Sequence, residues 1–248
     1  MSDLTWLVPI GLFAGALTTL AGLGGGMVMT LALSAMWGPQ RALATAAPAL
    51  LIGNFHRVGI YRAHLTKAVW PFVAGAVPGA LVGGWMTVVL PERLLQSLLI
   101  GVAALAVVRE LRTRWRRHKG ADAPSAGSLP TSVVLPGSFG AGIVTATSGG
   151  GGMLLGPLLL MTGHRAERFV AAASCIALTM HIARSFSYGV GGLVHTQTLV
   201  DALWLAGSVL VGNLAGKSAR RFLSEPRATA LTYAVLLLCV GLSVAGLR

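Results

Sequence analysis

Residues 18–27 read TTLAGLGGGM and lie within a run from Leu4 to Gln40 that contains no charged residue. Three consecutive glycines interrupt a helix, because each adds chain entropy and offers no side chain for packing. In lipid, the backbone groups freed by such a break must be buried in protein or must line a wet cavity. The stretch therefore predicts a discontinuous membrane helix whose interruption serves a function.

The same pattern occurs again in the second half of the chain. Residues 11–27 match residues 137–153 at an offset of 126, and residues 79–92 match residues 212–225 at an offset of 133. The identical pairs of the first match are Gly11/Gly137, Phe13/Phe139, Thr19/Thr145, Gly24/Gly150, Gly25/Gly151, Gly26/Gly152 and Met27/Met153. We predict two homologous helical repeats, because a helix break that is duplicated in two halves points to a transport site.

The composition indicates an all-α polytopic membrane protein. Of the 248 residues, 54% are hydrophobic and only 10% are charged, whereas a soluble domain has about 25% charged residues. Several apolar segments of about 20 residues follow one another, which is the length that spans a bilayer. The net charge of +12 resides in basic residues that flank these segments, as in cytoplasmic loops, so no nucleic-acid partner is expected.

A basic segment divides the chain. We predict a first transmembrane repeat at residues 1–110, a basic cytoplasmic linker at residues 111–131 and a second transmembrane repeat at residues 132–248. The linker changes from an Arg-rich stretch to one rich in Gly, Ala, Pro and Ser, which is typical of a flexible connection. Membrane lipids are the expected partner of its basic residues. The glycine-rich faces would also permit a homodimer.

Two topologies fit the long broken segments. Parallel halves with four crossings each place 11 of the 19 Lys and Arg residues on the linker side, which is little bias. Inverted halves, in which each broken segment enters and returns, raise that share to 15 of 19 and leave 4 outside. We expect inverted repeats with the linker in the cytoplasm and both termini outside, and the parallel eight-span arrangement stays open.

The glycine breaks predict an anion site. A helix that begins near Met27 or Met153 presents unpaired N–H groups, and a helix N-terminus carries about half a positive charge. Two such termini that meet from opposite sides would hold a small oxyanion near the membrane centre. The groups expected there are Thr19, Gly24, Gly25, Gly26, Thr145, Thr147, Ser148, Gly150, Gly151 and Gly152. The alternative is that the glycines only allow close helix packing.

Polar residues inside the second and sixth spans are expected to flank this site. They are Asn54, His56 and Arg57 in the first half and His181 and Arg184 in the second. An ionisable residue within a span is costly and is therefore a functional candidate. The alternative is that the arginines extend to the interface and that the histidines are packed and hydrogen-bonded.

The acidic residues limit the function further. All seven Asp and Glu residues lie at segment ends or in loops, so a sodium cage, a carboxylate proton relay and cationic substrates are disfavoured. Proton coupling would have to use His56 or His181. No cofactor and no metal site is expected, because Cys175 and Cys239 are isolated inside apolar spans and no histidines cluster.

The segments Gly-Leu-Gly-Gly-Gly and Ser-Gly-Gly-Gly-Gly resemble those of the sulfite exporter TauE/SafE family, as do the short second span, the glycine-rich third span and the basic linker. The resemblance implies a secondary transporter of the cell inner membrane, an exporter of sulfite or organosulfonates. The residues by themselves predict only a small anion as the substrate.

Two other functions would use some of the same residues. An anion channel, or a permease for another small acid such as a carboxylate, would use the same site. An intramembrane enzyme would need Ser148 with His181 or His195 as nucleophile and base, but no Gly-x-Ser-x-Gly elbow surrounds Ser148. We therefore expect a transporter and not an enzyme.

Overall fold

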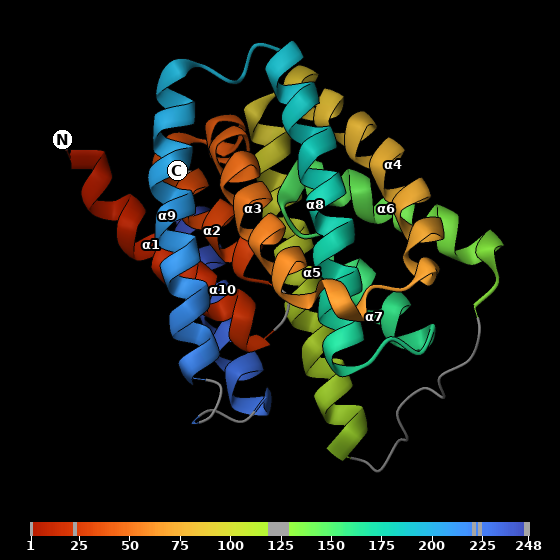
Figure 1. The fold of residues 1–248 in the computed structure, drawn as a ribbon. Helices are drawn as coiled ribbons and strands as arrows, with labels where there is room; N and C mark the ends of the chain where they lie inside the picture. The colour runs from red at the N-terminus through yellow and green to blue at the C-terminus, as the bar shows by residue number, and fades with distance from the viewer. Residues whose placement is uncertain (1, 22–23, 119–128, 220–221, 223–224, 246–248) are drawn as a thin grey trace.

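The computed structural model describes the whole chain except residues 1, 22–23, 119–128, 220–221, 223–224 and 246–248 (Figure 1). The described residues form ten α-helices and no strand, which confirms the all-α class. The helices are α1 (Ser2–Ala21), α2 (Gly25–Trp37), α3 (Pro39–Tyr61), α4 (Trp70–Val89), α5 (Glu92–His118), α6 (Thr131–Ser148), α7 (Gly152–Met161), α8 (Ala166–Val190), α9 (Thr196–Ala219) and α10 (Glu225–Ala245). Two 3₁₀ turns, Arg62–His64 and Lys67–Val69, connect α3 to α4.

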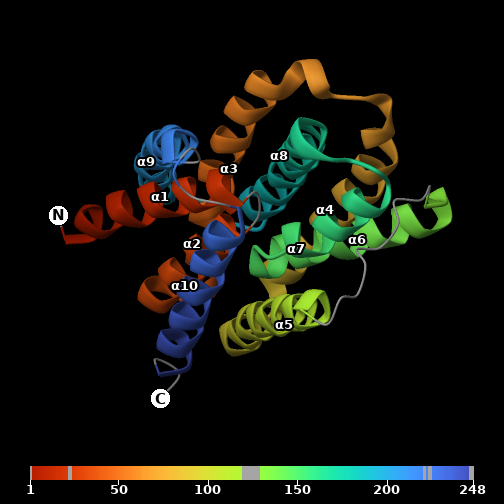
Figure 2. The same ribbon diagram turned by 90° about the horizontal axis from the view of Figure 1, so that it is seen from below.

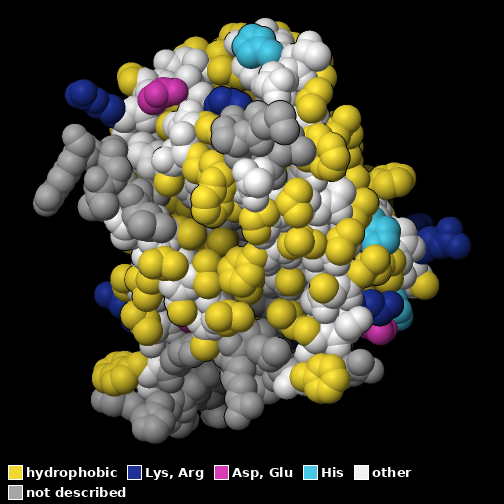
Figure 3. All heavy atoms as spheres, turned by 90° about the vertical axis from the view of Figure 1, so that its left-hand side faces the viewer, with side chains coloured by type: hydrophobic (Ala, Val, Ile, Leu, Met, Phe, Trp, Pro, Cys, Tyr) yellow, Lys and Arg dark blue, Asp and Glu magenta, His cyan; other side chains and the backbone are white. Residues whose placement is uncertain are grey.

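The chain is a multi-pass membrane protein. Within the described residues, four segments are long and apolar enough to cross a bilayer, namely Lys67–Val89, Glu92–Thr113, Ala166–Val190 and Thr196–Ala219. Large apolar side chains of α9, such as Leu203, Val211 and Leu214, are exposed, as expected for a surface in contact with lipid. Figure 3 shows hydrophobic side chains over much of one face, with charged groups towards its edges.

The two helices that follow the glycine segments are short. The 10 residues of α7 rise about 15 Å, half the thickness of a hydrocarbon core, and the 13 residues of α2 rise about 20 Å. At the junction before α2, Gly24 has a φ of 107°, and at the junction before α7, Gly149 has a φ of 70°. Both values lie in the left-handed region that favours glycine. The chain thus turns at a glycine before each short helix.

The two halves of the chain pack into each other. Helix α1 of the first half packs against α9 of the second, and α6 of the second half packs against α4 of the first (Figure 2). Glycines bring the backbones together: a Cβ on Gly79 would lie 2.0 Å from the carbonyl oxygen of Phe139, and a Cβ on Gly212 would lie 2.2 Å from that of Leu12. Gly79 and Gly212 are paired in the sequence repeat, so the same contact occurs twice.

Two of the clusters of buried apolar side chains follow the same division. One cluster joins α1, α2 and α3 with α9, and includes Leu7, Leu33 and Leu205. A second cluster joins α6, α7 and α8 with α4, and includes Phe72 and Leu159. Each cluster therefore combines three helices of one half with one helix of the other. We call these two groups of helices the α9 group and the α4 group.

The predicted linker begins inside a helix. Residues 111–118 are the last two turns of α5, and the following residues 119–128 lie outside the described part of the chain.

We predict that Gly212→Ala destabilises the protein and that Gly207→Ala on the same helix does not. The new Cβ at position 212 would collide with the α1 backbone, whereas nothing lies within 4 Å of the Cβ position at residue 207. Overpacking of this kind costs about 1–3 kcal/mol. Thermal unfolding in detergent, followed by size-exclusion chromatography, should show a lower midpoint for Gly212→Ala alone. Equal midpoints for the two variants would contradict the contact.

Candidate functional site

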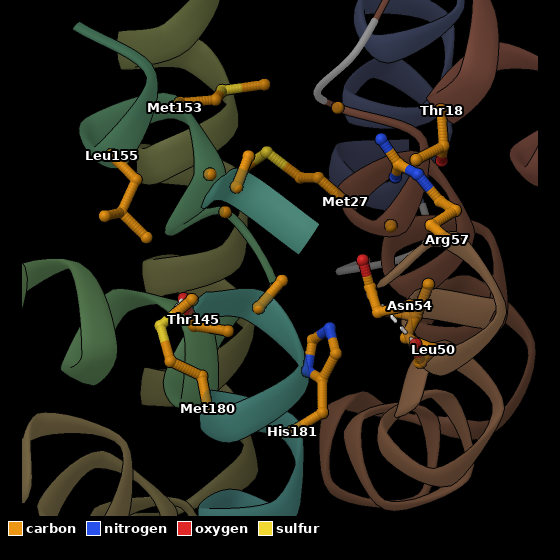
Figure 4. A pocket seen from close by; sticks show the side chains of 17 residues that line it. Thr18, Met27, Leu50, Asn54, Arg57, Thr145, Met153, Leu155, Met180 and His181 are labelled. Carbon is orange, nitrogen blue, oxygen red and sulfur yellow. Dashed lines mark hydrogen bonds between the residues drawn. The ribbon is translucent and has the colours of Figure 1, made fainter. Parts of the chain in front are cut away.

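A cavity of about 80 Å³ lies where the two glycine segments approach α3 and α8 (Figure 4). Its glycine lining comes from both halves and consists of Gly24, Gly26, Gly149, Gly150 and Gly152. The methionine that follows each triplet, Met27 or Met153, also lines it. The first turns of α2 and α7 therefore both begin at this cavity. Helix N-termini favour negative charge, so the two of them attract an anion.

The central glycine of each triplet packs against a threonine side chain, whereas the glycines beside it line the cavity. A Cβ on Gly25 would lie 2.0 Å from Oγ1 of Thr18, and a Cβ on Gly151 would lie 1.8 Å from Oγ1 of Thr145. These two glycines let the threonine side chain of the preceding helix fill the space beside the break. Neither Gly25 nor Gly151 is among the residues that line the cavity.

The two threonines occupy equivalent positions. Oγ1 of Thr18 donates to the carbonyl oxygen of Ala14 at 2.7 Å, and Oγ1 of Thr145 donates to that of Ala141 at 2.7 Å. Both threonines line the cavity. In the structure Thr145 is thus equivalent to Thr18, although the sequence match at an offset of 126 aligns it with Thr19. The offset between the halves is 127 at these threonines and 126 at the glycines, so the first half has one extra residue between them.

Asn54 on α3 and His181 on α8 face the cavity from opposite sides (Figure 4). Nδ2 of Asn54 donates to the carbonyl oxygen of Leu50 at 2.8 Å, which fixes the amide at the wall. His181 is only 5% exposed, and its Nδ1 has no hydrogen-bond partner among the described residues. A buried ring nitrogen without a partner is costly, so it points to a bound ligand or water at this place.

Arg57 brings a full positive charge to the same wall. Its side chain is 8% exposed, and it extends from α3 towards Thr18 (Figure 4). Among the described residues no Asp or Glu lines the cavity. The described lining therefore combines one guanidinium and two helix N-termini and contains no carboxylate, which is an environment for an anion.

A second, smaller cavity of about 30 Å³ lies beside the first. Thr19 and His56, both predicted for the central site, line this second cavity instead, together with Tyr61 and Lys217. Oγ1 of Thr19 lies 3.0 Å from Oδ1 of Asn213. Arg57 lines both cavities and is thus the residue between them.

Three more predicted ligands lie away from the cavity. The hydroxyls of Thr147 and Ser148 donate to carbonyl oxygens of their own helix, at 2.9 Å and 2.7 Å. Arg184 is fully buried, and its Nη1 donates to the carbonyl oxygen of Thr145 at 2.8 Å. It therefore supports the wall from behind. None of these three residues lines the cavity.

The residues that sequence reasoning missed are mostly apolar. They are Met27, Leu50, Met153, Leu155, Ala173, Ala177 and Met180, together with Thr18 and Gly149. The repeated methionine after each glycine triplet was the available signal. The apolar lining would contact a carbon-containing part of a ligand while the donors bind its charged part. The described residues contain no group of three or more His, Cys, Asp or Glu side chains that could hold a metal ion.

We predict that Gly151→Ala abolishes anion binding and that Gly140→Ala, on the preceding helix α6, does not. The alanine at position 151 would push Thr145 out of place, whereas a Cβ at position 140 meets nothing within 4 Å. A ligand at about 100 times its Kd stabilises a protein by about 2.7 kcal/mol, so sulfite should raise the thermal midpoint of the wild type and of Gly140→Ala only. If sulfite stabilised Gly151→Ala as much as the wild type, the contact between Gly151 and Thr145 would not be required for anion binding.

Comparison with known proteins gives one result. The family model described as Sulfite exporter TauE/SafE matches residues 7–244, nearly the whole chain. This match confirms the resemblance predicted from the two glycine segments. Neither a curated protein nor a solved structure gives a significant match.

Proposed function

This chain belongs to the sulfite exporter TauE/SafE family, a family of membrane transporters, and we propose that it is a secondary transporter of small sulfur-containing anions such as sulfite or organosulfonates. The observation that carries the proposal is the cavity at which two helix N-termini, Arg57 and His181 meet. The sulfur chemistry is supported by family membership, and the anionic charge of the substrate by the site.

The size of the cavity supports a small substrate. A water molecule needs about 10–15 Å³ of such volume, so about 80 Å³ has room for several waters or one small anion. The oxygens of a sulfite or sulfonate group would accept hydrogen bonds from the backbone N–H groups at Gly26 and Gly152 and from Arg57. The carbon part of an organosulfonate would contact Met27 and Met153.

Export fits the charge of the substrate. An anion that leaves a cell with a negative interior moves downhill by about 2.3 kcal/mol per charge per 100 mV. The cavity contains one titratable imidazole, that of His181, and no described carboxylate, so we propose that the membrane potential drives the anion outward without a coupled sodium ion. A permease for a carboxylate is the alternative.

Arg57→Gln should lower sulfite flux about 10- to 100-fold, because a lost charge-assisted hydrogen bond costs about 1.5–3 kcal/mol. Arg62→Gln, at an exposed position just beyond α3, is the matched control and should leave flux unchanged. Flux is measured in proteoliposomes with labelled sulfite, sulfoacetate and acetate, with and without an imposed potential. Faster transport of acetate than of the two sulfur anions would favour the carboxylate permease.

We propose that the two halves are inverted repeats in the inner membrane, with the linker in the cytoplasm and both termini outside. The distribution of Lys and Arg residues supports this topology, and so does the exchange of α4 and α9 between the two helix groups. Epitope tags at both ends of the chain should be accessible in intact spheroplasts, and a tag at residue 124 only after lysis. Termini on the linker side would indicate the parallel eight-span arrangement.

A further inference from the structure

The α3 and α8 helices carry matched residues at one spacing. Asn54 and His181, Arg57 and Arg184, and Tyr61 and Tyr188 are each related by an offset of 127, the same offset that relates Thr18 to Thr145. If both halves had the same conformation, Arg57 and Tyr61 would lie in the same surroundings as Arg184 and Tyr188. The two sets of surroundings differ.

On α8, Arg184 and Tyr188 form a closed contact, and neither of them lines either cavity. Arg184 and Tyr188 are both fully buried. The Tyr188 hydroxyl donates to the carbonyl oxygen of Ala146, and Oγ1 of Thr87 on α4 lies 3.1 Å from the same oxygen. Arg184 donates to the preceding carbonyl oxygen of α6, that of Thr145. These bonds tie the end of α6 to α8 and α4.

The contact between α4 and α8 completes the closure. A Cβ on Gly84 would lie 2.6 Å from Cβ of Ser187, so the two helices touch at this point. Oγ of Ser187 also donates to the carbonyl oxygen of Leu81 at 3.2 Å. The two helices are therefore in direct contact at these residues.

The equivalent set on α3 is open. The repeat offsets of 133 and 127 relate Gly84 to Lys217 and Ser187 to Ile60. Lys217 and Ile60 line the second cavity, together with Tyr61 and Arg57. Residues of α3 and α9 thus line a cavity at the position where α8 and α4 are in contact.

We propose that these two contacts are the gates of an alternating-access cycle. The α8 gate consists of Thr87, Arg184, Ser187 and Tyr188, and it is closed in this structure. The α3 gate consists of Arg57, Ile60, Tyr61 and Lys217, and it is open. The inference rests on the proposed transport function. In the other state the α3 gate closes on the end of α1, and the α8 gate opens a cavity equivalent to the second one.

The closed gate has a physical reason to open. Nε and Nη2 of Arg184 have no hydrogen-bond partner among the described residues, although the side chain is fully buried. Buried donors without acceptors destabilise the closed state. Arg184 contacts Thr145, which lines the central cavity, so an anion that moves from the cavity towards Arg184 would supply the missing acceptors. Arg57, which lines both cavities, is the residue equivalent to Arg184 at the open gate.

A thiol-labelling experiment tests the gates without knowledge of the substrate. Ile60→Cys and Ser187→Cys are made singly in the full chain, with Cys175→Ser and Cys239→Ser, and a charged methanethiosulfonate reagent is applied to both sides of vesicles. The reagent should modify Ile60→Cys, whereas Ser187→Cys should be protected. Adding Tyr188→Phe removes one hydrogen bond of the closed gate and should raise labelling at position 187 about fivefold, with a decrease at position 60.

Tyr61→Phe is the matched control at the other gate. It should leave Ser187→Cys protected and keep Ile60→Cys labelled, because it removes a hydrogen bond that forms only in the opposite state. If Tyr188→Phe does not insert, Thr87→Val keeps the side-chain shape and makes the same test.

The opposing explanation is a permanent difference between the halves, with Lys217 too large for its gate to close. Unchanged labelling at both positions in Tyr188→Phe or Thr87→Val would establish this and overturn the proposal. Reciprocal changes without any sulfite flux would retain the gates and overturn the proposed substrate. Sulfite flux with unchanged labelling would retain the substrate and overturn the gates.

Discussion

The fold depends on how two helix breaks are buried in apolar surroundings. At each break a threonine of the preceding helix bonds to its own helix and fills the space next to the central glycine. Thr18 fills the space beside Gly25, and Thr145 fills the space beside Gly151. This contact excludes any side chain at the central glycine, and it leaves the outer glycines of each triplet, Gly24 and Gly26 in the first, facing the cavity. One packing contact thus positions both the helix start and the open backbone beside it.

The exchange of helices between the halves determines where this cavity can form. Helix α9 crosses to the first half and α4 to the second, so neither half can pack without the other. Glycine contacts along both pairs hold the backbones too close for side chains to intervene. The cavity lies where the α9 group meets the α4 group, and a shift of one group against the other would alter access to it. The cavity therefore lies at the interface between the two groups, whereas each of the two proposed gates lies within one group.

Much of the fold followed from patterns in the sequence, and the placement of hydroxyl side chains did not. The apolar content predicted helices, and the matched glycines predicted the repeat of Gly79 and Gly212 that brings helices together. The sequence match aligns Thr145 with Thr19, whereas the structure places it at the position equivalent to Thr18, because identity alone does not reveal one extra residue in the first half. Thr147 and Ser148 were expected at the site, but hydroxyls within a helix bond readily to the carbonyl four residues back, as both do here.

The internal repeat allows positions in close helix contacts to be compared with positions that face the cavity. Some matched positions that contact backbone keep their residue type, as in Gly25 and Gly151 or Gly79 and Gly212. The positions that face the cavity from α3 and α8 differ: Asn54 stands opposite His181, and Leu50 is matched by Ala177. Two identical walls would present the same groups to both sides of a ligand. Two different walls instead support the proposed organosulfonate substrate, because such an ion has charged oxygens at one end and a carbon chain at the other.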